Sequence, residues 1–380
     1  MTDLFFFGSL RDRALLELVL GRPVSDRDIA PARAPGFATF ALADEAYPFL
    51  AEAAGAAAQG IVVSGISSDD LERLTYFEET EYGLQPITIE SAGVRREVQH
   101  FASTGKAATT DGLWDYNAWL RDEKPVAMEA ASELMAHMGI VPMEQIDTIW
   151  TGIMIRARMR ARAKAETPVT GRFRAARPAD DVISVRIGRP YTAYFALEQH
   201  RLRHRRFDGA MSEPIERSVL TSGDAVTVIP YDPVKDRVML IEQFRAPMFA
   251  RGDTCPWGIE AIAGRIDQET DAEICARREA LEEGGVTLGR VEIVSRYYSS
   301  PGITAEHITS FVGQATLDDE GGIYGVAHEN EDIRAFTCQL DAAMEAVASG
   351  EINNAPAILS LLWLRQHRVR LQREWIPALA

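Results

Sequence analysis

The stretch Gly264–Val286 reads GRIDQETDAEICARREALEEGGV. Within it, Thr270 is followed three residues later by Glu273, which is the spacing of a capping box. This pair predicts a helix that starts near Asp271. Cys275 would lie inside the helix, where an unpaired cysteine is expected to be a small core residue.

The same helix is predicted to have an apolar stripe and an acidic face. Ile274 and Leu281 lie seven residues apart and predict the stripe. Glu279, Glu282 and Glu283 stand at positions i, i+3 and i+4, so their carboxylates share a face roughly opposite to it. One interpretation is a solvated acidic surface. The other is a divalent cation site, because Mg²⁺ favours carboxylate oxygens together with substrate phosphates and relieves the repulsion between them.

The spacing of the whole stretch resembles the signature of the Nudix hydrolases. The positions in register are Gly264, Arg278, Glu279, Ala280, Glu282, Glu283, Gly285 and Val286. One position departs, because Thr270 stands where the signature has its first Glu. The resemblance implies that this Glu pairs with the signature Arg. Its absence therefore bears on the orientation of Arg278, and Glu269 is a candidate to replace it as the partner.

Length and composition predict a two-domain protein of ordinary globular type. The chain has 380 residues, of which 46% are hydrophobic and 25% charged. Its net charge of −16 disfavours nucleic acid as a partner. A membrane is not expected either, since no apolar run is long enough to span one. The three widely spaced cysteines match neither a zinc site nor a disulfide framework, so a reducing cytoplasm is the expected location.

Residues 1–105 are predicted to form the first domain. A buried strand at 4–7 is followed by the turn Gly8-Ser9-Leu10. A short helix is predicted at 69–77 and overlaps the motif Leu74-Thr75-Tyr76-Phe77-Glu78. With Tyr47-Pro48, these motifs resemble the gamma-glutamylcyclotransferase (AIG2-like) family, a β-barrel flanked by helices. The usual Tyr before the Gly is Phe7 here.

That resemblance implies an active site. Glu78 matches the family's catalytic Glu, which would move a proton while the substrate amine attacks its own side-chain carbonyl. Backbone N–H groups of the Gly8–Leu10 turn would bind the substrate carboxylate. The alternative is that the fold serves only for binding or dimerisation and that Glu78 is a surface acid.

Residues 106–175 are interpreted as a helical extension and linker. Arg156, Arg160 and Lys164 form one stripe on its last helix. A contact with a phosphate or a partner is one interpretation, and a solvated helix face is the other.

Residues 176–380 resemble the ADP-ribose pyrophosphatase branch of the Nudix hydrolases. The matching motifs are Glu242-Gln243-Phe244-Arg245, Pro256-Trp257, Ser300-Pro301-Gly302, His328-Glu329-Asn330-Glu331-Asp332 and Asn353-Asn354-Ala355. Pro301 lies sixteen residues beyond Gly285, and this spacing resembles the one found in enzymes that act on ADP-ribose.

The resemblance implies a role for each matching residue. Mg²⁺, or Mn²⁺ in its place, would be held by the Ala263 carbonyl, Glu279, Glu283 and Glu331. Glu329 would act as the base that activates water, with Glu282 as a further catalytic residue. The substrate would contact Arg245, Glu260, Pro301 and Arg217, the last from a partner subunit, since such pyrophosphatases are commonly swapped homodimers.

The sequence thus predicts an α+β protein of two domains, an AIG2-like β-barrel followed by a Nudix α/β/α sandwich. The expected activity is Mg²⁺-dependent hydrolysis of ADP-ribose to AMP and ribose 5-phosphate. The alternatives are another nucleoside diphosphate sugar as substrate, and gamma-glutamyl cyclotransfer at Glu78 in addition.

Overall fold

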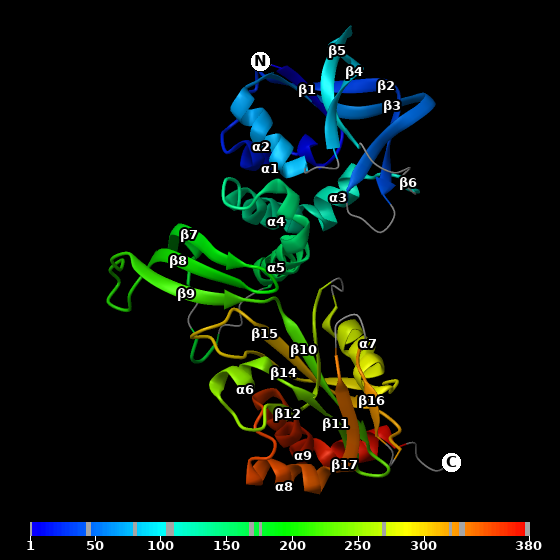
Figure 1. The fold of residues 1–380 in the computed structure, drawn as a ribbon, viewed down its shortest axis with the longest axis vertical. Coiled ribbons are helices and arrows are strands. Elements are labelled where there is room, and N and C mark those ends of the chain that lie inside the picture. Colours follow the sequence, from blue (N-terminus) through cyan, green and yellow to red (C-terminus); the bar gives the residue numbers. More distant parts are fainter. Residues whose placement is uncertain are drawn as a thin grey trace. The chain divides into compact units, whose positions relative to one another are not determined.

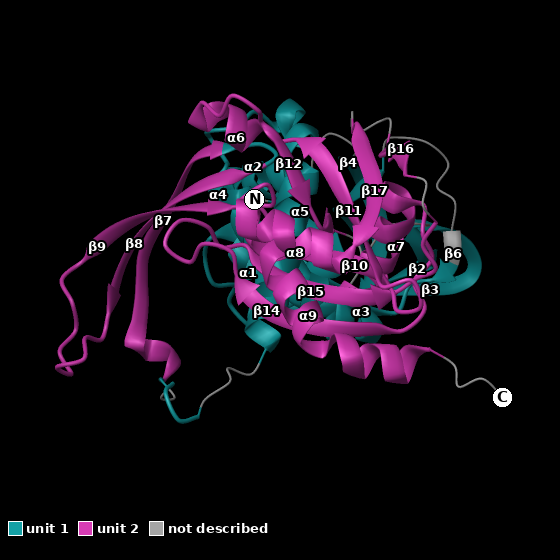
Figure 2. Cartoon of the chain, turned by 90° about the horizontal axis from the view of Figure 1, so that it is seen from below, with its two compact units in different colours: residues 1–177, 192–194 teal, residues 178–191, 195–380 magenta. Residues whose placement is uncertain are grey.

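The computed structural model describes residues 2–42, 47–78, 82–103, 110–166, 171–174, 177–267, 271–318, 321–326 and 331–376 (Figure 1). The chain divides into two compact units (Figure 2). Unit 1 comprises residues 1–177 and 192–194, and unit 2 comprises residues 178–191 and 195–380. The architecture is α+β in both units.

Unit 1 is built around a sheet in the order β3-β1-β5-β4-β2-β6. Its strands are β1 (Thr2–Phe6), β2 (Ile29–Leu42), β3 (Pro48–Ile66), β4 (Tyr82–Ser91), β5 (Val94–Ser103) and β6 (Thr110–Leu113). Strand β2 also pairs with β3, so the pairings close into a ring. The β-barrel expected from the sequence stays a prediction.

Helices cover one side of this sheet. They are η1 (Ser9–Arg11), α1 (Arg13–Leu20), α2 (Ser68–Glu78), α3 (Tyr116–Asp122), α4 (Lys124–Ala136), η2 (Met143–Gln145) and α5 (Asp147–Ala165). Leu4, Leu15, Leu134 and Ile153 are fully buried in one shared core, so the α4–α5 extension packs as part of unit 1.

The basic stripe of α5 is an ion-pair network for most of its length. Arg156 has no exposed side-chain surface, and its Nε donates to Glu133 Oε1 at 2.8 Å. Arg160 Nη1 donates to the other oxygen of Glu133 at 2.6 Å, and Lys164 pairs with Glu129. The solvated-face interpretation is therefore wrong for Arg156, because α4 places a buried carboxylate against it. Removing one partner of such a pair would leave the other charge buried and unpaired. The pair is therefore a structural link between α4 and α5.

Unit 2 contains a mixed sheet in the order β14-β15-β10-β11-β17-β16, with β12 paired to β11 and β13 to β10. Its strands are β10 (Ala225–Asp232), β11 (Arg237–Phe244), β12 (Trp257–Glu260), β13 (Ile262–Arg265), β14 (Val291–Tyr298), β15 (His307–Gln314), β16 (Gly322–Tyr324) and β17 (Ile333–Gln339). The helices are η3 (Ala179–Asp181), α6 (Ala246–Arg251), α7 (Ala272–Gly284), α8 (Leu340–Ser349) and α9 (Ala355–Trp375).

Helices lie on both faces of this sheet. Val226 and Val228 of β10 pack in a core with α7, whereas Ile229 and Tyr231 of the same strand pack in a core with α8 and α9. Alternate side chains of a strand point to opposite faces, so a strand covered on both sides is apolar throughout. This arrangement holds α7 against the sheet and thereby positions the site described below.

A second sheet of unit 2, β7-β8-β9, stands apart from the mixed sheet. It consists of β7 (Val182–Thr192), β8 (Ala196–His204) and β9 (Ile215–Thr221). Along β7, Val182, Ile183 and Val185 are 56%, 47% and 52% exposed. Among the helices of the described residues, none is long and apolar enough to cross a membrane.

Candidate functional site

Helix α7 carries the candidate site of unit 2. It begins after Asp271, whose side chain accepts a hydrogen bond from the Glu273 N–H at 2.7 Å, and it ends at Gly285, whose φ of 63° suits glycine. The predicted start of the helix is therefore right. The capping side chain is Asp271, and Thr270 of the predicted capping box lies outside the described residues.

The buried face of α7 differs from the prediction. Ile274 and Leu281, expected in the core, are 59% and 58% exposed. The face that packs on the sheet consists of the small residues Cys275, Ala276, Ala280 and Gly284, with the carboxylates Glu279 and Glu283 among them. The prediction was wrong because it took the largest apolar side chains as the mark of the core. Small side chains instead let the helix approach the sheet closely enough to turn its carboxylates inward.

Gly264 of β13 makes room for one of these carboxylates. A Cβ atom at position 264 would lie 1.9 Å from Glu279 Oε1, well inside contact distance. Glycine here provides space for the Glu279 side chain, which a larger residue would have to displace; its φ is not in the left-handed region. The first Gly of the stretch and its central Glu, fifteen positions apart in sequence, are a single steric unit.

Glu283 is held by the backbone of the same strand. Its Oε2 accepts a hydrogen bond from the Ala263 N–H at 3.0 Å. Burial raises the pKa of Glu283 to about 8, and the negative charges of Glu279 and Glu331 add to this rise, whereas Arg245 opposes it. Burial likewise raises the pKa of Glu279 to about 7, with the neighbouring charge of Arg278 acting against the rise. Two carboxylates are therefore kept out of water with only partial compensation.

Arg278 is oriented by acids of its own helix. Its Nη2 lies 2.9 Å from Glu279 Oε1, and its Nη1 donates to Glu282 Oε2 at 2.6 Å. Glu269 and Thr270, the residues on which its orientation was expected to depend, lie outside the described residues. Glu282 thus contacts Arg278 and stands beside the two buried carboxylates.

Glu331 joins the cluster from the loop before β17. Its Oε2 accepts from the Val326 N–H at 3.0 Å, and its charge contributes to the raised pKa of both Glu279 and Glu283. Glu329, expected to act as base, lies outside the described residues. Within the described ranges, no three acidic, His or Cys side chains are already gathered as a complete set of metal ligands.

The donor chemistry of this cluster nevertheless fits a hard divalent cation. Glu279, Glu283 and Glu331 supply carboxylate oxygens, and the negative charge of Glu331 adds to the raised pKa of both Glu279 and Glu283. Such repulsion is relieved when a cation is held between the carboxylates. The structure shows the Ala263 N–H in use, and the expected role of its carbonyl stays a prediction.

Arg245 and Glu260 form one pair beside the cluster. Arg245 Nη2 and Nε lie 2.6 and 3.1 Å from Glu260 Oε2. Arg245 directly follows β11, and Glu260 is the last residue of β12, which pairs with β11. Glu260 is buried, so this ion pair holds the guanidinium in place. Both residues were expected to contact substrate, and the structure adds that Glu260 orients Arg245.

The other two residues expected to contact the substrate are Pro301 and Arg217. Pro301 is exposed in a turn, in which the Ile303 and Thr304 N–H groups donate to the Ser300 carbonyl. Arg217 is exposed on β9 and donates to the Glu216 carbonyl. Both views draw β9 away from α7 (Figures 1 and 2). One chain therefore does not bring Arg217 to the carboxylate cluster.

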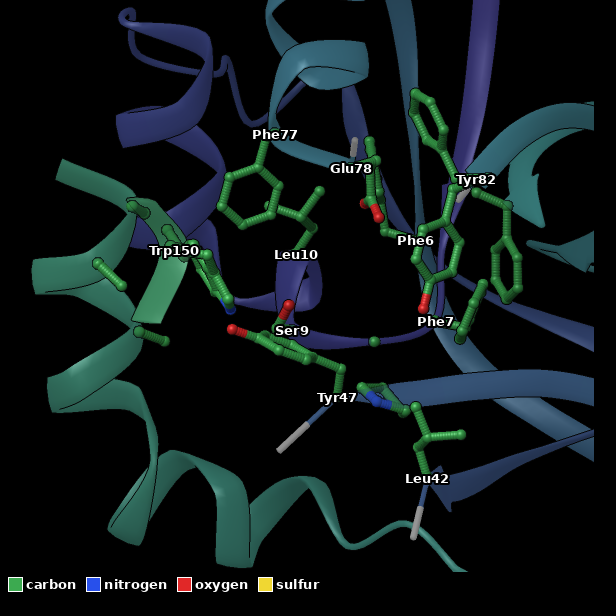
Figure 3. Close-up of a pocket in the computed structure, with 18 of the residues that line it drawn as sticks. Phe6, Phe7, Ser9, Leu10, Leu42, Tyr47, Phe77, Glu78, Tyr82 and Trp150 are labelled. Atoms are coloured by element: carbon green, nitrogen blue, oxygen red, sulfur yellow. The ribbon is translucent and has the colours of Figure 1, made fainter. Parts of the chain in front are cut away.

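Unit 1 contains a cavity of about 310 Å³ that brings its own predicted residues together. Glu78 at the end of α2 and Gly8, Ser9 and Leu10 after β1 all line it. Figure 3 shows Glu78 on one side and Tyr47 and Trp150 across from it.

Asp147 and Trp150 also line this cavity, and no sequence motif pointed to either of them. Both come from α5, beyond the segment that carried the resemblance. A tryptophan on an amphipathic helix is an ordinary core signal, so only the folded arrangement assigns it to a cavity.

Two family models match the chain, one in each of its two units. The model described as gamma-glutamyl cyclotransferase, AIG2-like, matches residues 4–121, and the NUDIX domain model matches residues 221–375. An ADP-ribose pyrophosphatase of Escherichia coli (strain K12) is 40% identical over 185 residues, which are 49% of this chain and 88% of that protein. One from Haemophilus influenzae is 34% identical over 187 residues, 49% of this chain and 86% of the relative. A GDP-mannose pyrophosphatase of Salmonella choleraesuis is 33% identical over 150 residues, 40% of this chain and 78% of the relative.

The fold and the carboxylate helix define a hydrolase domain, and these matches show its family. The chain belongs to the Nudix hydrolases, and that enzyme domain follows an AIG2-like region in the same chain.

The contact between Gly264 and Glu279 predicts a steric requirement. In Gly264→Ala, the new methyl group has to displace the Glu279 carboxylate, so we expect Mg²⁺ affinity to fall about 10- to 100-fold. Isothermal titration calorimetry measures this directly. Gly188→Ala is the control, because its Cβ would meet only ordinary contacts at 4.0 Å. Equal affinity in the two variants would contradict the steric role of Gly264.

The raised pKa values predict a pH-dependent response to Mg²⁺. Without metal, the protonated forms of Glu279 and Glu283 favour the folded state, so their contribution is present below the unfolded pKa of 4.5 and is lost as pH rises through about 7 and about 8. Mg²⁺ binds the ionised forms. We therefore expect the Mg²⁺-induced rise in Tm to be larger near pH 9 than near pH 6, with affinity at least about tenfold higher.

Thermal denaturation at both pH values, with and without Mg²⁺, provides the measurement. The variant Glu279→Gln/Glu283→Gln lacks the two titrating groups and should show no such difference. A wild-type shift that is the same at both pH values would rule out these carboxylates as the ligands.

Proposed function

We propose that the C-terminal half is a Mg²⁺-dependent pyrophosphohydrolase that cleaves ADP-ribose to AMP and ribose 5-phosphate. The observation that carries this proposal is the cluster of desolvated carboxylates that α7 and the loop before β17 hold against β13. The pyrophosphatases of Escherichia coli and Haemophilus influenzae support the choice of substrate, because the chain spans most of their length.

Each residue of the cluster has a defined task in this reaction. When bound, Mg²⁺ supplies positive charge that neutralises the diphosphate oxygens. Glu279, Glu283 and Glu331 hold that charge, with the Ala263 carbonyl as a further donor. Arg245, kept in place by Glu260, donates to a phosphate oxygen, and the turn at Pro301 lies along the substrate. Glu329 removes the proton of the attacking water, and Glu282 orients Arg278 beside Glu279.

Another nucleoside diphosphate sugar is the alternative substrate. Relatives named GDP-mannose pyrophosphatase share a shorter stretch of the chain at 33% identity. The same cluster would cleave either diphosphate, because it acts on the phosphates and not on the base or the sugar. Mn²⁺ would serve the same carboxylates, since it also accepts oxygen ligands.

Product analysis with ADP-ribose and Mg²⁺ tests this function. We expect AMP and ribose 5-phosphate from the wild type, near-complete loss of both in Glu283→Gln, and a rate about 10²- to 10⁴-fold lower in Glu329→Gln. Glu273→Gln is the matched control, because Glu273 lies on the same helix but pairs with Arg277. Failure of the wild type to cleave ADP-ribose, together with cleavage of GDP-mannose, would favour the alternative substrate. Failure with both would contradict the proposal.

We also propose that the active form is a homodimer in which β7-β8-β9 packs on a second copy. Two observations support it: β7 exposes apolar side chains, and Arg217 is remote from the cluster of its own chain. Sedimentation velocity should show a dimer that Val185→Asp dissociates. Val234→Asp, at a 71% exposed position in a hairpin turn, should leave it intact. A monomeric, fully active wild type would exclude this arrangement.

A second function, gamma-glutamyl cyclotransfer, is proposed for unit 1. The cavity that places Glu78 together with Gly8, Ser9 and Leu10 favours it. Backbone N–H groups of the turn would receive the substrate carboxylate, and Glu78 would accept a proton from the attacking amine.

The expected product of this second function is 5-oxoproline, measured by mass spectrometry with gamma-glutamyl amides as substrates. Glu78→Gln should abolish it and leave ADP-ribose hydrolysis unchanged, since the two sites lie in separate units. Glu72→Gln, exposed on the same helix, is the control. A wild type without 5-oxoproline release would leave unit 1 as a binding or dimerisation module.

A further inference from the structure

Gln243 is a buried polar side chain on the sheet face that carries the carboxylate cluster. It lies on β11 and is 8% exposed. Met239 and Ile241, which alternate with it along the strand, pack in the core that includes α7. Ile333 of β17, its partner across the ladder, belongs to the same core. Directly paired residues of antiparallel strands point to one face, so the amide of Gln243 points toward α7.

The amide nitrogen of Gln243 is buried and makes no hydrogen bond with any residue that the structure describes. Such a donor has lost its hydration without compensation, which lowers the stability of the fold. An apolar side chain would avoid this cost, as Met239 and Ile241 do on the same strand. The unpaired donor therefore points to an acceptor that reaches it when the site is loaded.

Two of the acids on this face already have other partners. Both oxygens of Glu260 accept from Arg245, at distances from 2.6 to 3.2 Å. Glu283 Oε2 accepts from the Ala263 N–H at 3.0 Å, on strand β13, which pairs with β10, whereas Gln243 lies on β11. Neither acid is therefore the acceptor that best suits this amide.

Glu331 is the acceptor that fits. It stands two residues before Ile333, which places it diagonally across the β11–β17 ladder from Gln243, within reach of a long side chain. Its Oε2 accepts from the Val326 N–H, and its other oxygen accepts from none of the residues that the structure describes. Glu331 also belongs to the carboxylate cluster of the candidate site.

We propose that Gln243 is a positioning residue for the metal site: when a divalent cation is bound, its amide donates to the Glu331 carboxylate and holds that ligand in place. Ionised carboxylates only accept hydrogen bonds, so Glu331 selects the nitrogen end of the amide. Donors behind a metal-binding carboxylate fix its orientation. The inference rests on the proposed Mg²⁺ site, but not on the identity of the substrate.

The hydrogen bond requires Glu331 to turn from its own loop, where it contacts Val326, toward the two carboxylates of α7. A cation supplies the attraction for that turn, because it relieves the repulsion among the three carboxylates. Gln243 then gains an acceptor, and the cost of its buried donor is removed in the same step.

The variant Gln243→Met separates a positioning role from a structural one, since methionine has a similar size and no hydrogen-bond donor. We expect Mg²⁺ affinity, measured by isothermal titration calorimetry, to fall about 10- to 100-fold. In metal-free protein we expect Tm to stay equal or to rise, because the unpaired donor is gone. A glutamine that only supports the fold would instead lower Tm when replaced and leave the affinity unchanged.

Ser360→Ala is the matched control. The Ser360 hydroxyl is likewise buried without a described partner, but it lies on α9, which packs on the opposite face of the sheet. We expect this variant to bind Mg²⁺ as the wild type does. An equal loss of affinity in Ser360→Ala and Gln243→Met would overturn the inference, because it would make the effect a general one of the core.

A double-mutant cycle with Glu331→Ala tests the partner. If Gln243 acts through Glu331, adding Gln243→Met to Glu331→Ala should change the residual Mg²⁺ affinity less than about twofold. Additive losses would overturn the inference, and so would wild-type affinity in Gln243→Met alone.

Calorimetry with Mg²⁺ alone also separates this inference from the proposed function. A wild type that binds Mg²⁺ with the expected dependence on Gln243, but does not cleave ADP-ribose, would contradict the proposed substrate and leave the positioning role standing. A wild type that cleaves ADP-ribose while Gln243→Met keeps its Mg²⁺ affinity would do the reverse. A wild type that binds no Mg²⁺ would contradict both.

Discussion

The Nudix half depends on one electrostatic constraint, the burial of Glu279 and Glu283 between α7 and β13. Carboxylates lose solvation there, and among the residues that the structure describes, Arg278, Arg245 and one backbone N–H offset part of that loss. Such an arrangement is costly in the absence of a cation and becomes favourable with one. The packing of the helix, the glycine of the facing strand and the position of the Glu331 loop are all conditions for keeping these charges close together. Without a cation, this arrangement therefore lowers the stability of the fold at the place proposed to bind the substrate.

Unit 1 differs from the Nudix half because it contains a cavity lined by residues of its core. Strands form its floor, and α4 and α5 close one side. An apolar helix pair alone could shift to fill such a space. The buried Glu133 carboxylate, shared by Arg156 and Arg160, fixes the angle between the two helices, because any displacement would separate buried charges. These ion pairs account for two arginines of the helical extension, Arg156 and Arg160.

The two halves thus differ in how charge is used. In the Nudix half, negative groups are gathered at the place proposed to bind a metal and a diphosphate. In unit 1, buried charges of both signs are paired with each other between α4 and α5. The acidic net charge of the chain agrees with both uses and with the absence of nucleic acid from the proposed partners.

The sequence alone determined the Nudix family and the start of α7, because a glycine, three carboxylates and a helix cap rarely fall at this fixed spacing by chance. It did not determine which face of α7 is buried. Ile274 and Leu281 are exposed and Glu279 is buried because helix packing is decided by the shape of the facing strand, where Gly264 leaves space. Nor did it place Asp147 and Trp150 at a cavity or Arg156 in an ion pair. Those outcomes depend on partners distant in sequence, and only the tertiary structure brings such partners together.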